Sequence, residues 1–185
     1  SGMVRIEAAA AAGNWTMLLP TDDGTSGQVL QTDGGGTTTW ATPSGTAYTT
    51  LVTLGTAQTV ASTTLEDVTG LEFSVTSGTT YRFYALIKYN STTDATGSRW
   101  TINGPTVTLL AYTSRYTQTA TAQTVNFANA HQIPASASTS SLSAGSIAII
   151  EGLINPSANG TEIVQHASES TSTVTAQAGS TLEWW

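Results

Sequence analysis

The sequence predicts an all-β protein whose main domain is a jelly-roll-like antiparallel β-sandwich. Threonine is the commonest residue, and its β-branched, hydroxylated side chain suits a pleated surface with one hydrated face. Only 9% of the residues are charged, so solubility must come largely from Thr, Ser, Asn and Gln. Short apolar-polar segments recur between Gly, Pro and Asn turn signals, a spacing typical of sandwiches and barrels.

The first 45 residues read as a separate stem or neck. Ser1 and Gly2 resemble a scar left by tag cleavage, and the alanine-rich stretch 4–12 is expected to form one or two helical turns. Residues 18–40 then offer two short strands separated by polar turns and a glycine triplet. Neither strand is long enough to bury a face against its neighbours. A Pro- and Gly-containing joint at 42–46 separates this stem, 1–45, from a head, 46–185.

Ten strand segments follow in the head, separated by turns. Turn signals stand at Thr69-Gly70, Ser77-Gly78, Asn103-Gly104-Pro105, Asn155-Pro156 and Asn159-Gly160. The last segment is expected to be two strands hinged at Ala178–Gly179. The predicted strands are 50–54, 58–61, 71–76, 80–90, 99–103, 107–116, 124–128, 146–155, 161–167 and 172–185.

Two of these strands, 80–90 and 146–155, carry apolar side chains on both faces. An antiparallel strand with one face in water should alternate cleanly between apolar and polar residues. The second face is therefore expected to be covered, either by a loop of the same chain or by another subunit. The sequence favours the subunit, and the candidate interface residues are Tyr84, Leu86, Ile147, Ile149 and Leu153.

The composition excludes several partners and cofactors. The formal net charge is −7, and the basic residues are scattered, so a nucleic-acid function and attraction to an anionic membrane are not expected. No apolar run reaches the roughly 18 residues of a membrane span, so no membrane insertion is expected. The absence of cysteine excludes disulfides and thiolate metal sites. Without disulfides, oligomerisation is the expected source of additional stability.

No catalytic or cofactor site is predicted. Glu66, Asp67 and Glu72 flank turns, where water prevents the raised pKa that an acid catalyst needs. Glu151 interrupts an apolar strand and is expected to pair with Arg82 or Lys88.

The two histidines are expected to be ordinary surface or strand residues. His131 and His166 have no second ligand at metal-binding spacing. A metal site would require three copies of one histidine on a threefold axis, and none is predicted.

One cluster of rings and guanidiniums is a candidate receptor surface. Such side chains stack on sugars and dominate protein contacts. The alternative is that the rings belong to the core or an interface. The loops 90–98 and 128–144 offer small polar residues for receptor contacts. The candidate residues are Arg99, Trp100, Tyr112, Arg115 and Tyr116.

Three separated motifs in the head resemble one family. They are D-V-T-G-L-x-F-x-V-x-x-G-x-x-Y-x-F at 67–83, E-G-x-I-x-P-S-A-N-G-T at 151–161, and A-S-E at 167–169. Together with the ending "AQAGSTLEWW", they resemble the trimeric receptor-binding tip domains of bacteriophage tail fibres. The resemblance covers most of residues 51–185.

The stem resembles another phage fibre element, P-x-x-D-G-x-x-G-Q-V-L-x-T-D-G-x-G-x-x-x-W, at 20–40. This resemblance implies intertwined trimeric β-structure over 14–42, with Val29, Leu30 and Trp40 facing inward.

The implied function is non-catalytic attachment to a bacterial surface receptor. The receptor would be a glycan or an outer-surface protein, and other tail proteins would be partners. The chain would be assembled in the host cytoplasm and carried on the virion tail tip. The alternatives are a virion structural or decoration protein without receptor binding, and a bacterial surface lectin-like module.

Overall fold

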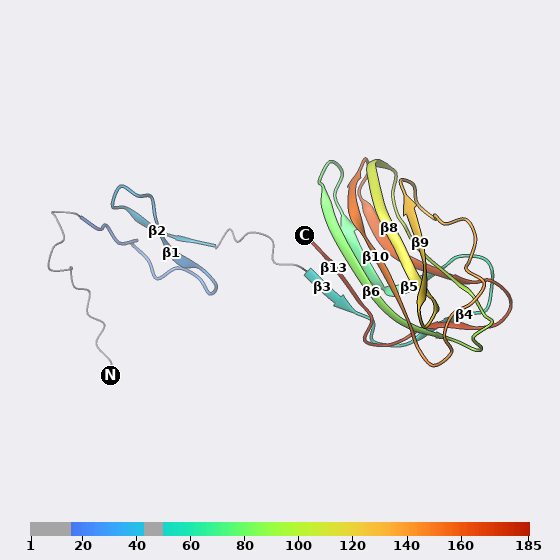
Figure 1. Cartoon of the computed structure of the whole chain (residues 1–185). Coiled ribbons are helices and arrows are strands. Elements are labelled where there is room, and N and C mark those ends of the chain that lie inside the picture. The colour runs from blue at the N-terminus through green and yellow to red at the C-terminus, as the bar shows by residue number, and fades with distance from the viewer. Residues whose placement is uncertain (1–15, 43–49) are drawn as a thin grey trace, which may run out of the picture. The chain divides into compact units, whose positions relative to one another are not determined.

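The computed structural model describes residues 16–42 and 50–185 (Figure 1). The chain divides into two compact units, Ser1–Ala47 and Tyr48–Trp185, which we describe separately. The expected helical turns at 4–12 lie outside the described residues. Within the described ranges, no helix has the length and apolarity needed to cross a membrane.

The described part of the N-terminal unit is built around one hairpin. Strands β1 (Val29–Thr32) and β2 (Thr38–Ala41) pair antiparallel, and Leu18 adds a parallel bridge to Thr37. The Asp33 Oδ1 atom accepts hydrogen bonds from the Gly35 and Thr37 amides at 2.7 and 3.0 Å, which lowers the pKa of Asp33. Local hydrogen bonds of this kind close a turn without any partner chain.

Trp40 packs within its own unit. Its indole lies against Gly24, where an added Cβ would come within 2.7 Å of the ring, and its Nε1 donates to the Asp22 carbonyl at 2.8 Å. The two short strands expected here pair within one chain, and the trimeric intertwining of residues 14–42 stays a prediction. Val29 and Leu30 are 47% and 42% exposed and remain open to a partner.

The head consists of two antiparallel sheets. In the larger, eight-stranded sheet, the strand order is β3-β13-β6-β10-β8-β9, and β12 pairs with both β4 and β6. The smaller sheet has the order β5-β11-β7. The larger sheet contains β3 (Thr50–Thr53), β4 (Gln58–Val60), β6 (Tyr81–Ser91), β8 (Val107–Thr119), β9 (Ala122–Ala128), β10 (Ser146–Pro156), β12 (Val174–Ala176) and β13 (Thr181–Trp184). The smaller contains β5 (Glu66–Val75), β7 (Ser98–Asn103) and β11 (Gly160–Ser168).

One apolar core joins the two sheets. Alternate residues of β6 and β10 point into it, including Phe83, Ile87 and Ile150, which are at most 2% exposed. The smaller sheet contributes Phe73 and Trp100 to the same cluster. Because one face of each sheet is buried against the other, the head is a β-sandwich-like all-β fold.

The predicted strands of the head are confirmed, although several are longer than expected. Strand β5 begins at Glu66 rather than Leu71, and β8 extends to Thr119. The C-terminal segment does break into two strands, because Gly179 has a φ of +86°, a conformation that favours glycine.

Candidate functional site

The outward-facing side of the larger sheet carries an apolar surface. The strand register places Leu86, Ile149, Arg115 and Val125 in one row across β6, β10, β8 and β9. These strands lie side by side in Figure 1. No loop among residues 50–185 buries this side, so burial under a described loop of the head does not explain its apolar residues. We call it the outer sheet face: Tyr84, Leu86, Val125, Phe127, Ile147, Ile149 and Leu153.

The exposure of the outer sheet face is large for apolar side chains. Phe127 is 81% exposed, Val125 49%, Ile147 47% and Leu86 39%. Tyr84, Ile149 and Leu153 are half-buried. Contiguous apolar surface of this kind marks an interaction site in a soluble protein.

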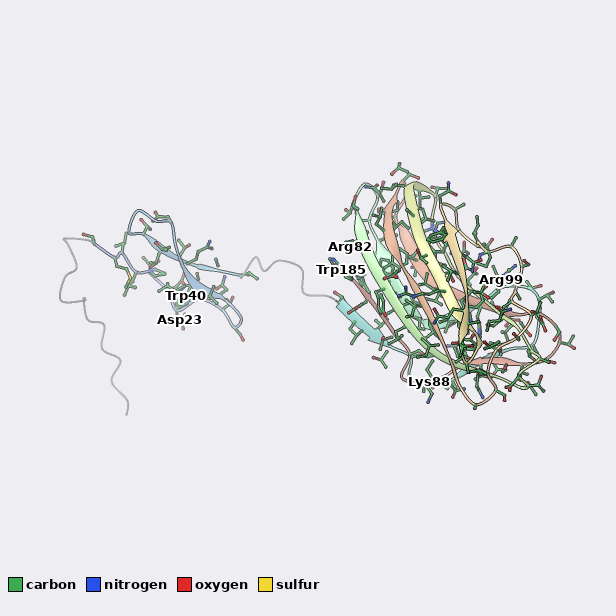
Figure 2. The ribbon with its side chains drawn as sticks, viewed as in Figure 1. Asp23, Trp40, Arg82, Lys88, Arg99 and Trp185 are labelled. Carbon is green, nitrogen blue, oxygen red and sulfur yellow. The ribbon has the colours of Figure 1, made fainter. Side chains whose placement is uncertain are left out.

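One ion pair lies within the outer sheet face. Arg115 Nη2 contacts Glu151 Oε1 at 3.1 Å, with both side chains about two-fifths exposed. The expected pairing of Glu151 with Arg82 or Lys88 was therefore wrong. Register places Lys88 opposite Ile147, too far along β6, whereas Arg82 and Arg115 both stand diagonal to Glu151. Arg82 instead lies over the Trp185 ring, 5.4 Å from its centroid. Figure 2 shows the two residues at the same side of the head.

Three of the five candidate receptor residues are buried in the core. Trp100 and Tyr116 are 0% exposed and Tyr112 is 4% exposed. Burial raises the pKa of Tyr116 to about 12. Their assignment as receptor contacts was wrong, because alternation along β7 and β8 turns these rings inward. Arg115 lies on the outer sheet face, so the five residues do not form one surface.

Arg99 lies in a pocket beside the smaller sheet. The connection between β9 and β10, residues 129–145, runs along the free edge of β7, and we call it the strap. The Gln132 amide donates to the Ile102 carbonyl at 3.0 Å, and the Ser138 amide donates to the Ser98 carbonyl at 2.9 Å. The strap thus protects an edge strand that would otherwise be open to pairing.

The pocket at Arg99, which we call the Arg99 pocket, has a volume of about 310 Å³. Arg99 Nη1 donates to the Ala135 carbonyl of the strap, while Nε is buried and has no hydrogen-bond partner among the described residues. Burial lowers the pKa of Arg99 from its ordinary value. The pocket is lined by Thr63, Arg99, Ala135, Ser136, Ala137, Ser168 and Glu169.

A histidine–carboxylate pair fastens the start of the strap. His131 Nε2 lies 3.0 Å from Glu162 Oε1, and Glu162 is 1% exposed. Burial raises the pKa of Glu162, and His131 partly offsets this. Gly104 leaves room for the carboxylate, since a Cβ there would lie 2.0 Å from Glu162 Oε2. Sequence reasoning missed this pair because its members are 31 residues apart.

His166 is a strand residue of β11, one of the two places expected for the histidines, and it is buried in the core. It is 1% exposed, and its ring centroid lies 5.2 Å from that of Trp100. Within residues 16–42 and 50–185, its Nδ1 has no hydrogen-bond partner. Desolvation lowers the pKa of His166 to about 4. The ring is therefore neutral at physiological pH.

Neither a metal site among the described residues nor a similar known protein indicates the function. Among the described residues, no group of three or more His, Cys, Asp or Glu side chains is arranged to hold a metal ion. Comparison with models of known protein families and with curated protein sequences finds no match.

Proposed function

We propose that this chain is the receptor-binding tip of a bacteriophage tail fibre, acting as a homotrimer that attaches to bacterial cells without catalysis. The observation that carries the proposal is the outer sheet face. It exposes apolar side chains of β6, β10 and β9, with Arg115 of β8 in the row between Ile149 and Val125. Such a face is costly in water unless a partner covers it.

A second and third copy of the chain are the proposed cover. Cyclic symmetry lets each copy bury its face against the next without leaving an exposed apolar surface. The Arg115–Glu151 pair matches two charges of this side of the sheet, and Lys88, opposite Ile147, is a further charge at its edge. The threefold order follows from the resemblance of the head motifs to trimeric fibre tips, which also favours a jelly-roll arrangement of the sandwich.

The positions of two residues with shifted pKa values, Glu162 and His166, support attachment rather than catalysis. Glu162 and His166 have shifted pKa values, but both lie inside the head. Glu162 is engaged with His131, and His166 packs on Trp100. A catalytic acid or base must reach its substrate, so these two groups are better explained as structural.

The receptor would be a bacterial surface glycan or outer-surface protein, and the chain would bind it at the tail tip of the virion. A tip on the virion would be assembled in the host cytoplasm with other tail proteins. Trimeric attachment gains from multivalency, because linked sites raise the overall affinity by about 10²- to 10⁴-fold when all can engage.

Binding of fluorescently labelled protein to a panel of bacterial cells tests the proposal. We expect the wild-type chain to adhere to at least one strain and to release no sugar from its surface. Leu86→Asp, which places a charge on the outer sheet face, should lose most adherence because it loses trimeric avidity. A wild-type protein that adheres to no strain, or that steadily releases reducing sugar, would overturn the proposal.

A further inference from the structure

We infer that the Arg99 pocket binds one neutral sugar residue of a surface glycan through the sugar's hydroxyl groups, an inference that rests on the proposed attachment function. The pocket lies on the smaller sheet and the strap, whereas the outer sheet face lies on the larger sheet. In Figure 2, Arg99 lies on the side of the head away from Arg82 and Trp185. The outer sheet face and the Arg99 pocket share no residue, so self-association through that face would not involve the pocket's lining.

Several hydrogen-bonding groups in the pocket make no hydrogen bond to another described residue. Arg99 Nη1 is engaged by the Ala135 carbonyl, but Nη2 makes no hydrogen bond within the described residues. The Glu169 carboxylate and the Ser136 hydroxyl also make none to described residues.

The neighbouring strap serines differ from Ser136. The hydroxyls of Ser138, Ser140 and Ser141 donate to the carbonyls of Ser98, Gln118 and Thr96, at 3.1, 3.0 and 2.6 Å. The strap thus satisfies the serines that fasten it to the head. It leaves the serine at the pocket free for a ligand.

The charges of the pocket favour a neutral, polyhydroxylated ligand. Arg99 and Glu169 have opposite charges but form no ion pair with each other in the described structure. A guanidinium donates and a carboxylate accepts, so together they match hydroxyl groups, which do both. An acidic sugar would face Glu169 and a chain of net charge −7. The volume of about 310 Å³ stands at the lower end of the range for small-ligand sites, about 300–1,000 Å³.

The backbone around the pocket and the Arg99 side chain are held in place before any ligand arrives. The strap is fixed to β7 at Gln132 and Ser138, and Arg99 is held by the Ala135 carbonyl. The Glu169 amide donates to the Gly97 carbonyl at 3.2 Å, and an added Cβ on Gly97 would lie 2.8 Å from Glu169 Oε2. Such preorganisation lowers the entropy lost on binding.

Titration of the full-length protein with a panel of small molecules tests the inference. The panel contains neutral hexoses, N-acetylhexosamines, hexuronic acids and free amino acids, and binding is followed by ligand-observed NMR. We expect at least one neutral sugar to bind. Ser136→Trp, which fills the pocket, and Glu169→Gln, which weakens its acceptor, should each reduce that affinity by about tenfold or more.

Glu66→Gln is the matched control, because Glu66 is an exposed carboxylate at the start of β5, outside the pocket. It should leave sugar affinity unchanged. Circular dichroism and light scattering establish that each variant keeps the wild-type fold and mass. The inference is wrong if no neutral sugar binds, if only acids or amino acids bind, or if both pocket variants bind the sugar as the wild type does.

Cell adherence separates this inference from the proposed function. If the wild type and Ser136→Trp adhere equally to cells, attachment stands and the pocket is not the receptor site. If the wild type adheres to no strain but binds a neutral sugar in a pocket-dependent way, the sugar site stands and the attachment function fails.

Discussion

Protonation of His166 should destabilise the head in acid. The pKa of this residue falls from 6.5 in an exposed histidine to about 4 in the fold, because burial disfavours the imidazolium. A group with a depressed folded pKa contributes stability that is present above 6.5 and is lost as the pH falls through the folded value. The difference of about 2.5 pKa units predicts a loss of about 2 kcal/mol by pH 5 and about 3 kcal/mol by pH 4.

Urea unfolding of the wild type and His166→Phe, at one fixed chain concentration between pH 7 and pH 4, measures this loss. Phenylalanine retains a ring against Trp100 but does not titrate, so the variant should lack the wild-type slope between pH 6.5 and 4. The other titratable groups are the same in both proteins, so their contributions cancel in the difference between the two free energies of unfolding. If the free energies of unfolding of the two proteins change in parallel over this range, the assignment of a neutral, buried His166 is refuted.

Three further perturbations test other parts of the structure. The raised pKa of Glu162 in the fold means that the wild type loses stability as the pH rises through that pKa, whereas Glu162→Gln does not titrate. In urea unfolding, the stability of the variant relative to the wild type should therefore be greater at pH 8 than at pH 4.5. An equal difference at the two pH values would contradict the raised pKa. Gly97→Ala should displace the strap, since its Cβ would lie 1.6 Å from the Ser138 carbonyl oxygen; limited proteolysis should cut within 129–145, and an uncut strap would contradict the contact. Deletion of residues 1–45 should leave the head folded by circular dichroism but weaken its assembly; an unfolded head would show that the boundary is misplaced.

Much of the fold follows from local sequence pattern, because strand periodicity and turn residues are local signals. Alternation along β6 and β10 predicted both the inward core residues and the apolar outer sheet face. The same alternation places Tyr112 and Tyr116 on the inward side of β8 with Leu110, and this signal was available for the rings assigned to a receptor.

The contacts missed from the sequence are those set by register and long-range packing. Arg115 reaches Glu151 because β8 and β10 pair in one particular register, which neither strand specifies alone. His131 reaches Glu162, and Arg99 meets the strap, only after the connection between β9 and β10 folds back over the smaller sheet. No local spacing encodes these contacts.

The mass of the purified protein in solution tests the central claim most directly. Light scattering should give three chains of 19.1 kDa, about 57 kDa, unchanged on moderate dilution, since a stable trimer of this kind buries on the order of 2,000 Å² or more. Ile149→Asp should give monomer or aggregate, because it places an unpaired charge in the outer sheet face. A monodisperse wild-type species of 19.1 kDa, with the outer sheet face open to water, would contradict the account.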